Sequence, residues 1–265
     1  MTLKIVVMAK QVIDPETPTS AFRIDANVAS VPANQSPVIN GFDEQAIEAA
    51  IRLKEASGDA YVIVVSVGSG FALDVIKKPL AMGADELILL DDPAFSSSID
   101  PTVTIAALAA AIAKIGDVDV VLAGRQASDW DNAQVPLGVA EALGWPVATV
   151  AKKVDVNDMT IRVERVLSDG HEVVEATLPA VVTVSNELGI PRYPNMRGIM
   201  AARRVQPTVW SAHDVGLDIE AIRTAFELVS LDKPQSAVET EMIIGDDDAD
   251  AGRKLAQRLR DERII

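Results

Sequence analysis

Short apolar runs alternate with helical patterns through the first 144 residues. The stretch "LKIVVMAK", residues 3–10, is a nearly continuous β-branched run, which is typical of a strand buried on both faces of a parallel sheet. Similar runs occupy 60–70, 86–92 and 118–124, and segments with helical spacing occupy 42–58, 72–83, 102–116 and 132–144. We expect Pro79 to interrupt the second helix. The alternation predicts right-handed βαβ units, and therefore a doubly wound, mostly parallel, Rossmann-like α/β sheet.

The pattern changes after residue 148. Residues 150–185 alternate apolar and polar positions, with turn signals at Asn157-Asp158 and Asp169-Gly170. This predicts an antiparallel hairpin extension of the main sheet that ends in a buried strand at 180–184. Residues 210–218 have a loop-like composition, and a terminal helix is expected within 248–265 after an acidic, proline-containing stretch. We therefore predict an α/β domain over 1–230 and a C-terminal arm over 231–265.

Composition narrows the possible chemistry. A formal net charge of -15 disfavours nucleic acids and anionic membrane surfaces as partners. The absence of cysteine excludes disulfides, thiolate nucleophiles and iron–sulfur ligation, so any redox chemistry needs a bound cofactor. His171 is expected at an exposed hairpin tip, and no catalytic residue or metal site is expected. No long apolar run or secretory leader is evident, so we expect a cytoplasmic protein.

The candidate ligand site lies beyond the carboxyl ends of the predicted strands, where doubly wound sheets bind ligands. The segments "MAKQVID" (8–14), "NGFDE" (40–44), "VSVGSGF" (65–71) and "AGRQASDWDNAQV" (123–135) should meet there. A dinucleotide fingerprint and a P-loop are both absent from the sequence. The last segment favours a mononucleotide, with backbone N–H groups for phosphate and an aspartate for ribose. In the alternative interpretation, Asp129 and Asp131 cap the following helix.

A basic segment stands out in this acidic chain. "PRYPNMRGIMAARR", residues 191–204, holds four arginines and no carboxylate, together with two methionines. Its composition suits an adaptable apolar anchor flanked by arginines that bind an acidic partner. The alternative is a basic loop that packs Met196 and Met200 into its own domain.

These motifs, taken in order, resemble the β subunit of electron transfer flavoprotein. The resemblance covers nearly the whole chain and rests on "MAKQVID", "NGFDEQAIEAAIRLKE", "AMGAD", "GRQASDWDNAQV" and "LPAVVTV" followed by "PRYPNMRGIMAARR". It implies a heterodimer with an α subunit that holds most of an FAD. It also implies electron transfer from acyl-CoA or related dehydrogenases to a quinone oxidoreductase or other acceptor. Within the β subunit it implies a bound AMP or, in bifurcating members, a second FAD.

The resemblance also implies two sets of residues. The nucleotide-binding set is Met8, Asn40, Gly41, Phe42, Asp43, Val67, Gly124, Arg125, Gln126, Ala127, Ser128, Asp129, Trp130, Asp131, Asn132, Ala133, Gln134 and Val135. The partner-docking set, within a loop expected over 184–206, is Arg192, Tyr193, Met196, Arg197 and Ile199. Of these, Met196 falls at the position of the family's apolar anchor.

The choice between AMP and a second FAD stays open at this point. The "AQV" at 133–135 is similar to bifurcating members, but Trp130 and Pro136 replace glycines of their pattern. A bulky Trp130 could stack on a ring or obstruct a second flavin. The electron-carrier hypothesis therefore stands beside an NADH-oxidising bifurcating subunit and a stand-alone AMP- or ATP-binding regulatory protein.

Overall fold

Strand β1, Leu3–Met8, lies inside a nine-stranded sheet that organises the first compact unit of the chain. The computed structural model describes residues 2–25, 28–30, 36–95, 100–222, 224, 226–233 and 240–265. The chain forms two compact units, Met1–Leu231 and Asp232–Ile265, each defined by the contacts among its own residues.

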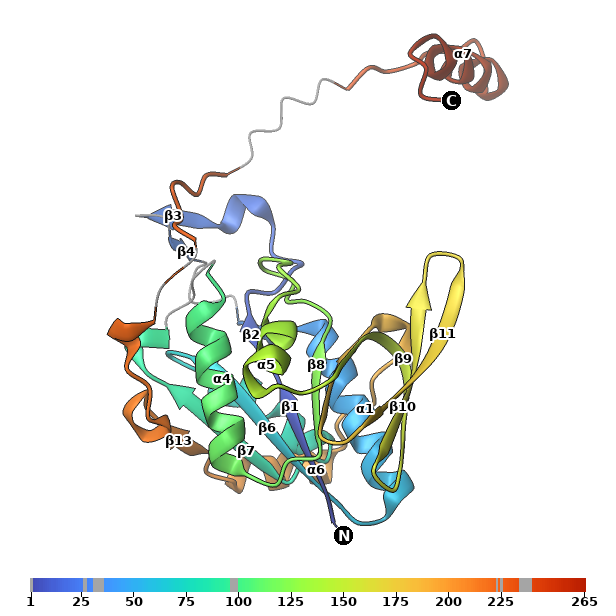
Figure 1. The fold of residues 1–265 in the computed structure, drawn as a ribbon. Coiled ribbons are helices and arrows are strands. Elements are labelled where there is room, and N and C mark those ends of the chain that lie inside the picture. The colour runs from blue at the N-terminus through green and yellow to red at the C-terminus, as the bar shows by residue number, and fades with distance from the viewer. Residues whose placement is uncertain are drawn as a thin grey trace. The chain divides into compact units, whose positions relative to one another are not determined.

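The sheet has the order β11-β10-β9-β12-β8-β1-β6-β7-β13 (Figure 1). Its pairings are parallel from β9 through to β13, and β10 and β11 add antiparallel pairings at one edge. The strand bounds are β6 Ala60–Gly68, β7 Glu86–Asp91, β8 Val120–Gly124, β9 Val147–Asn157, β10 Thr160–Leu167, β11 Gly170–Thr177, β12 Ala180–Val184 and β13 Thr208–Trp210. The predicted doubly wound α/β class is confirmed.

Helices cover both faces because β1 is apolar on both. Ile5 and Val7 belong to the core on the face of α1 Gly41–Ser57, together with α2 Leu73–Ile76, α3 Lys78–Met82 and α6 Met196–Arg204. Val6 and Met8 belong to the opposite core, beneath α4 Thr102–Ile115 and α5 Val135–Leu143. Alternate residues of a strand point to opposite faces, so one apolar run supplies two cores.

Short elements complete the first unit. Two small antiparallel sheets pair β2 Gln11–Val12 with β5 Val38–Ile39, and β3 Arg23–Asp25 with β4 Val28–Ser30. Single 3-10 turns are η1 Thr19–Ala21, η2 Pro93–Phe95, η3 Asn186–Leu188, η4 His213–Val215 and η5 Ile219–Ala221.

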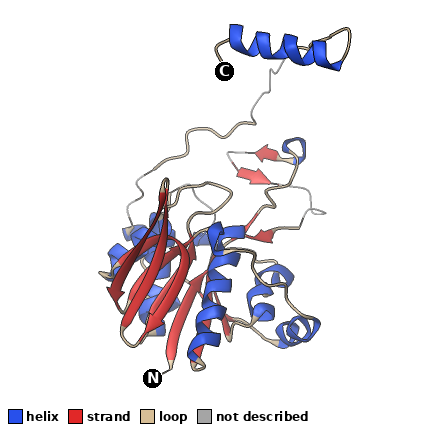
Figure 2. Ribbon diagram, turned by 90° about the vertical axis from the view of Figure 1, so that its right-hand side faces the viewer, coloured by secondary structure: helices blue, strands red, loops and turns tan. Residues whose placement is uncertain are grey.

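The hairpin extension forms as predicted. Strands β9, β10 and β11 are joined by two-residue turns and project as a twisted ribbon beside the parallel strands (Figure 2). Asp158 adopts a φ of 51° in the first turn, a left-handed conformation that Asp tolerates well. His171 is exposed near the second turn, as expected.

One local prediction was confirmed in part, and three others were wrong. The helical segment over 72–83 is interrupted as expected, but the break falls at Lys77, and Pro79 lies in the first turn of α3, where its missing N–H needs no partner. The helix predicted from residue 132 begins at Val135. The segment predicted as a loop over 210–218 begins with Trp210, the last residue of edge strand β13. The docking loop predicted over 184–206 contains helix α6, which Asn195 caps by accepting a hydrogen bond from the Gly198 N–H at 2.8 Å.

The second unit contains α7, Asp248–Asp261. Asp247 caps it by accepting a hydrogen bond from the Asp250 N–H at 2.7 Å, and Asp248 and Asp250 favour its positive end. None of its side chains is buried within the chain. Within the described part of the chain, every helix is too short or too polar to span a bilayer.

We predict that Gly198→Ala destabilises the first unit by about 1–3 kcal/mol, because overpacking forces backbone shifts. A Cβ at Gly198 would lie 2.3 Å from the carbonyl oxygen of Ala81, where α6 packs on α3, and backbone cannot move aside as a side-chain end can. Urea unfolding followed by tryptophan fluorescence measures this, since the three tryptophans all belong to the first unit.

Gly252→Ala in α7 is the matched control, because a Cβ there meets nothing within 4 Å. It should leave the tryptophan-monitored transition unchanged. Equal midpoints for the Gly198 variant and the parent would contradict close α3–α6 packing.

Candidate functional site

The candidate site lies at the topological switch point of the sheet. From β1 the chain proceeds outward through β6 and β7, and then crosses to β8 on the other side of β1. The covering helices change face at the same crossing, from α1–α3 to α4. Adjacent loops leave in opposite directions at such a point, and doubly wound sheets bind ligands beyond the carboxyl ends of the strands there, which in this chain are the ends of β1 and β8.

A buried carboxylate joins the two strand ends. Asp43, in the first turn of α1, accepts a hydrogen bond from the Lys10 N–H at 2.8 Å after β1. Its other oxygen accepts one from the Gly124 N–H at 3.0 Å at the end of β8. The side chain thus fixes both turns to the start of α1.

Burial also changes the protonation of this group. Desolvation raises the pKa of the Asp43 carboxyl from its ordinary 3.8 to about 7, against the opposing effect of the two N–H donors. The residue is 6 % exposed and Asn40 beside it is fully buried.

Asn40 holds the long loop between β8 and α5. Its side-chain amide donates to the carbonyl of Gln126 at 2.8 Å, and its side-chain oxygen accepts from the Ser128 N–H at 3.2 Å. Asn40 is the N-terminal flanking residue of α1, yet its side chain makes no capping hydrogen bond to that helix. The positive end of α1 and the loop are therefore held together.

The two aspartates of the loop have partners outside α5. Asp129 forms an ion pair with Lys10 at 2.6 Å, and Asp131 accepts a hydrogen bond from the Gln126 side chain at 2.7 Å. Asp131 and Ala133 have φ of 51° and 54°, so the chain is still turning before α5 begins. The N-terminal flanking residue of α5 is Gln134, without a side-chain cap. The interpretation that Asp129 and Asp131 cap this helix is therefore wrong.

Position 124 requires glycine because the end of β8 lies very close to the start of α1. A Cβ there would lie 2.6 Å from the backbone carbon of Phe42 and from a carboxylate oxygen of Asp43. The next residue, Arg125, places its guanidinium 4.7 Å from the centre of the Phe42 ring. Glycine lets the end of β8 touch the start of α1, which keeps the site compact.

The loop also carries buried polar atoms that need partners. Among the described residues, the Nε of Arg125 and the Oγ of Ser128 are buried without a protein hydrogen-bond partner. Such groups are costly unless a ligand or water satisfies them. A donor nitrogen and a hydroxyl beside a helix N-terminus fit the phosphate and hydroxyl groups of a nucleotide.

The structure brings most of the expected nucleotide set together. Residues 40–43 and 124–128 are joined by the bonds of Asp43 and Asn40, and Met8 is buried at the end of β1, next to β8. Val67 lies near the carboxyl end of β6, next to β1. Sequence reasoning missed Lys10, whose N–H and side chain contact the site; its place in "MAKQVID" was the available signal.

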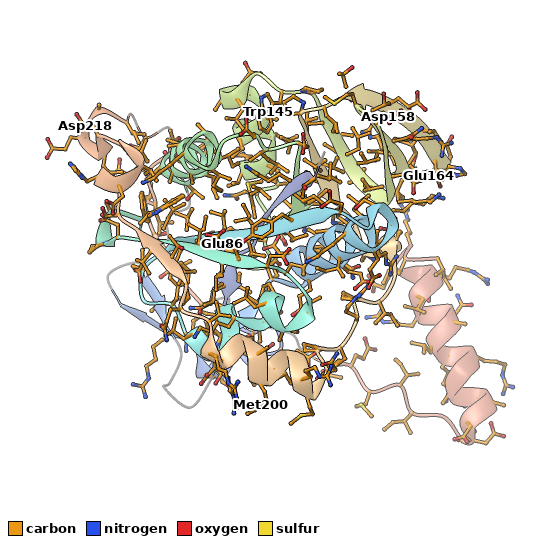
Figure 3. All side chains as sticks on the ribbon, turned by 90° about the horizontal axis from the view of Figure 1, so that it is seen from below. Glu86, Trp145, Asp158, Glu164, Met200 and Asp218 are labelled. Atoms are coloured by element: carbon orange, nitrogen blue, oxygen red, sulfur yellow. The ribbon has the colours of Figure 1, made fainter. Side chains whose placement is uncertain are left out.

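The expected docking set lies on and before α6. Tyr193 is 94 % exposed and Met196 is 73 % exposed, as is Ile190 at 91 %. Met200 is also exposed, on the outer side of α6 (Figure 3), and Ile199 is half-buried. Hence the interpretation that Met196 and Met200 pack into their own domain is wrong. Arg192 and Arg197 are half-buried and exposed, respectively.

Fold and site together define a doubly wound α/β protein with a candidate mononucleotide site at its switch point. A family model described as the electron transfer flavoprotein domain matches residues 31–215. The chain belongs to the electron transfer flavoprotein β-subunit family. β subunits of this family pair with an α subunit and are associated with flavin.

Individual relatives match over most of their length. The chain is 37% identical to the caffeyl-CoA reductase-Etf complex subunit CarD of Acetobacterium woodii, over 99% of this chain and 100% of that protein. It is 40% identical to the electron transfer flavoprotein subunit beta of Clostridium acetobutylicum, over 82% and 81%. It is 35% identical to that of Thermoanaerobacterium thermosaccharolyticum, over 99% and 100%.

We predict that the raised pKa of Asp43 makes stability fall as pH rises. The folded state holds the proton more tightly than the unfolded state, in which the pKa is the ordinary 3.8, so this contribution is complete below pH 3.8 and is lost progressively as pH rises to about 7. Between pH 5.5 and 8.0 this contribution should fall by about 2 kcal/mol. Urea unfolding at the two pH values, compared for the parent and Asp43→Asn, isolates it.

Asp43→Asn should lose this part of the pH dependence and also be less stable at pH 5.5, because its amide nitrogen would face an N–H donor. Asp74→Asn, at an exposed position of α2, is the control and should keep the parent's slope. An identical slope in the Asp43 variant would contradict the assignment.

Proposed function

We propose that this chain is the β subunit of a heterodimeric electron transfer flavoprotein. It accepts electrons from acyl-CoA-type dehydrogenases and passes them through FAD to a quinone oxidoreductase or another acceptor. The observation that carries the proposal is the site at the switch point, where Asn40 and Asp43 hold the start of the 124–135 loop against the start of α1. Family membership supplies the class of chemistry.

The protein's own contribution is binding and positioning. FAD, held mainly by the α subunit, supplies the one- and two-electron chemistry, and no residue of this chain needs to act as an acid or base. The β subunit adds a structural nucleotide, AMP, at this site. Arg125 and Ser128 supply the polar atoms for it, and Gly41 and Phe42 border it at the N-terminus of α1.

A second candidate function is an NADH-oxidising, bifurcating subunit with a second FAD at the same site. Two observations favour keeping it. The loop carries "AQV" at 133–135, and the chain is similar over its whole length to a protein named as a subunit of a caffeyl-CoA reductase-Etf complex. Half-buried Trp130 would then lie beside a flavin ring.

The surface around α6 is proposed to dock the dehydrogenase. Tyr193 is 94 % exposed and Met196 is 73 % exposed, beside the exposed Arg197, and interface hot spots are enriched in Tyr and Arg. Arg197 and Ile199 extend this surface along the helix. The partner surface should be an apolar pocket with acidic residues at its rim.

The second unit is proposed to bind the α subunit. Met242 is 76 % exposed and Ile244 is 80 % exposed, and α7 buries none of its side chains within this chain. Apolar groups on a terminal arm gain stability when a partner covers them.

The nucleotide content of the heterodimer tests the proposal. We expect the chain, co-expressed with its α subunit and denatured after purification, to release one FAD and one AMP per heterodimer on chromatography. Two FAD and no AMP would replace the carrier by the bifurcating candidate, and titration with NADH should then bleach a second flavin. A stable β monomer that binds AMP or ATP without an α subunit would instead support the stand-alone regulatory protein.

Met196→Ala tests the docking surface. We expect electron transfer from a short-chain acyl-CoA dehydrogenase, reduced with butyryl-CoA, to lose about tenfold in kcat/KM, or roughly 1.4 kcal/mol. Nucleotide content should not change. Met159→Ala is the matched control, because Met159 is also exposed but lies at the turn of the hairpin extension. Equal rates for the Met196 variant and the parent would refute the anchor.

A further inference from the structure

Arg192 is bound to two carboxylates of α1. Its Nε donates to Glu48 at 2.9 Å, its backbone N–H donates to the same carboxylate at 3.1 Å, and its Nη1 and Nη2 donate to Glu55 at 2.5 and 2.9 Å. Glu48, Arg52 and Glu55 follow one another at helical spacing of four and three, so they share one face of the helix.

Arg52 completes the cluster from the helix side. Its Nε donates to Glu48 at 2.8 Å, and its Nη1 donates to the carbonyl of Leu188 at 3.1 Å. The chain leaving η3 is therefore bound to α1 at Leu188 and again at Arg192. Between and beyond these points, Ile190 and Tyr193 have almost no contacts with the rest of the chain, at 91 % and 94 % exposed.

The charges of Arg192 and Glu48 favour an ion pair that persists at neutral pH. The side chain of Glu48 is 5 % exposed, so its contact with Arg192 is shielded from solvent, unlike a typical surface pair. Burial of Glu48 acts to raise its pKa, but the bonds from Arg192 and Arg52 outweigh this and hold the pKa below its usual range. Both partners stay charged at neutral pH.

We propose that Arg192 is a positioning residue that fixes the docking surface of Tyr193 and Met196 to α1, and that it does not itself bind the dehydrogenase. This rests on the proposed docking function and changes the role expected of Arg192 from the sequence. Its Nε, Nη1 and Nη2 are all engaged within the subunit, so a partner carboxylate would have to compete with two that are already in place. Fixing the segment before docking reduces the conformational entropy lost on binding.

The first experiment measures the anchor without any partner. Hydrogen exchange in the purified heterodimer is compared for the parent and Arg192→Ala at the amides of Leu188, Gly198 and Ile199, each protected by a local hydrogen bond. We expect exchange at these amides to be about tenfold faster in the variant. Arg203→Ala, which removes one exposed charge from the same segment, should leave it unchanged. Unchanged exchange in Arg192→Ala would overturn the proposal.

A double-mutant cycle then tests the link to docking. With the butyryl-CoA-reduced dehydrogenase as electron donor, Arg192→Ala should raise KM about fivefold at constant kcat. When Arg192→Ala is already present, adding Met196→Ala should lower kcat/KM by about twofold or less. Arg192→Lys should have a KM close to that of Arg192→Ala, because an ammonium group lacks the planar fork of donors with which arginine binds two carboxylates. Full rescue by lysine, or the full Met196 effect in both backgrounds, would overturn positioning.

Two further comparisons keep the outcomes separable. Glu55→Gln weakens the anchor from an exposed position and should shift exchange in the same direction by a smaller factor, which guards against a misfolded Arg192 variant. If Met196→Ala has no effect in the parent, the docking function fails, while the exchange result still decides whether Arg192 holds the segment.

Discussion

The hydrogen bonds of one buried carboxylate determine how the candidate site is assembled. Asp43 is 33 positions from Lys10 and 81 from Gly124, and it accepts a backbone N–H from each. The Lys10–Asp129 ion pair and the bonds of Asn40 also join these turns, and Asp43 adds a buried side chain that accepts a backbone N–H from both. Burying such a group is unfavourable unless each oxygen has a donor, so the carboxylate requires these two turns to stay in this arrangement.

Helix α1 extends this constraint across the domain. Its N-terminus carries Asn40 and Asp43 at the candidate site, and its apolar face fills the core beneath. Further along the helix, Glu48 and Glu55 hold Arg192. The core packing of α1 therefore positions the candidate site and the segment before α6 relative to one another. A rigid amphipathic helix is suited to this, because interiors are close-packed and transmit small displacements.

The sequence predicted what local periodicity determines. Local signals predicted strands that are apolar on both faces, such as "LKIVVMAK", and helices that end at Gly58 or Gly144. Each of these signals lies within a few residues. The partner of Asp129 was not found, because helix capping is local but an ion pair to Lys10 spans 119 positions. The role expected for Arg192 rested on composition in the same way, and the carboxylates that bind it lie 137 and 144 positions away.

The anchoring of Arg192 also changes how the basic segment acts in an acidic protein. Its charge is offset by Glu48 and Glu55, so it contributes little to the field that a partner meets. Within the described residues, Arg197, Arg203 and Arg204 have no carboxylate within ion-pair distance, and they lie on α6 beside exposed Met196 and Met200. Under the proposed docking function, long-range attraction of an acidic partner therefore falls to the arginines of α6, and the apolar contact falls to Tyr193 before the helix and Met196 at its start. Such a separation of charge and apolar contact fits the proposed electron carrier, which needs fast association from charge and rapid release from a small apolar contact.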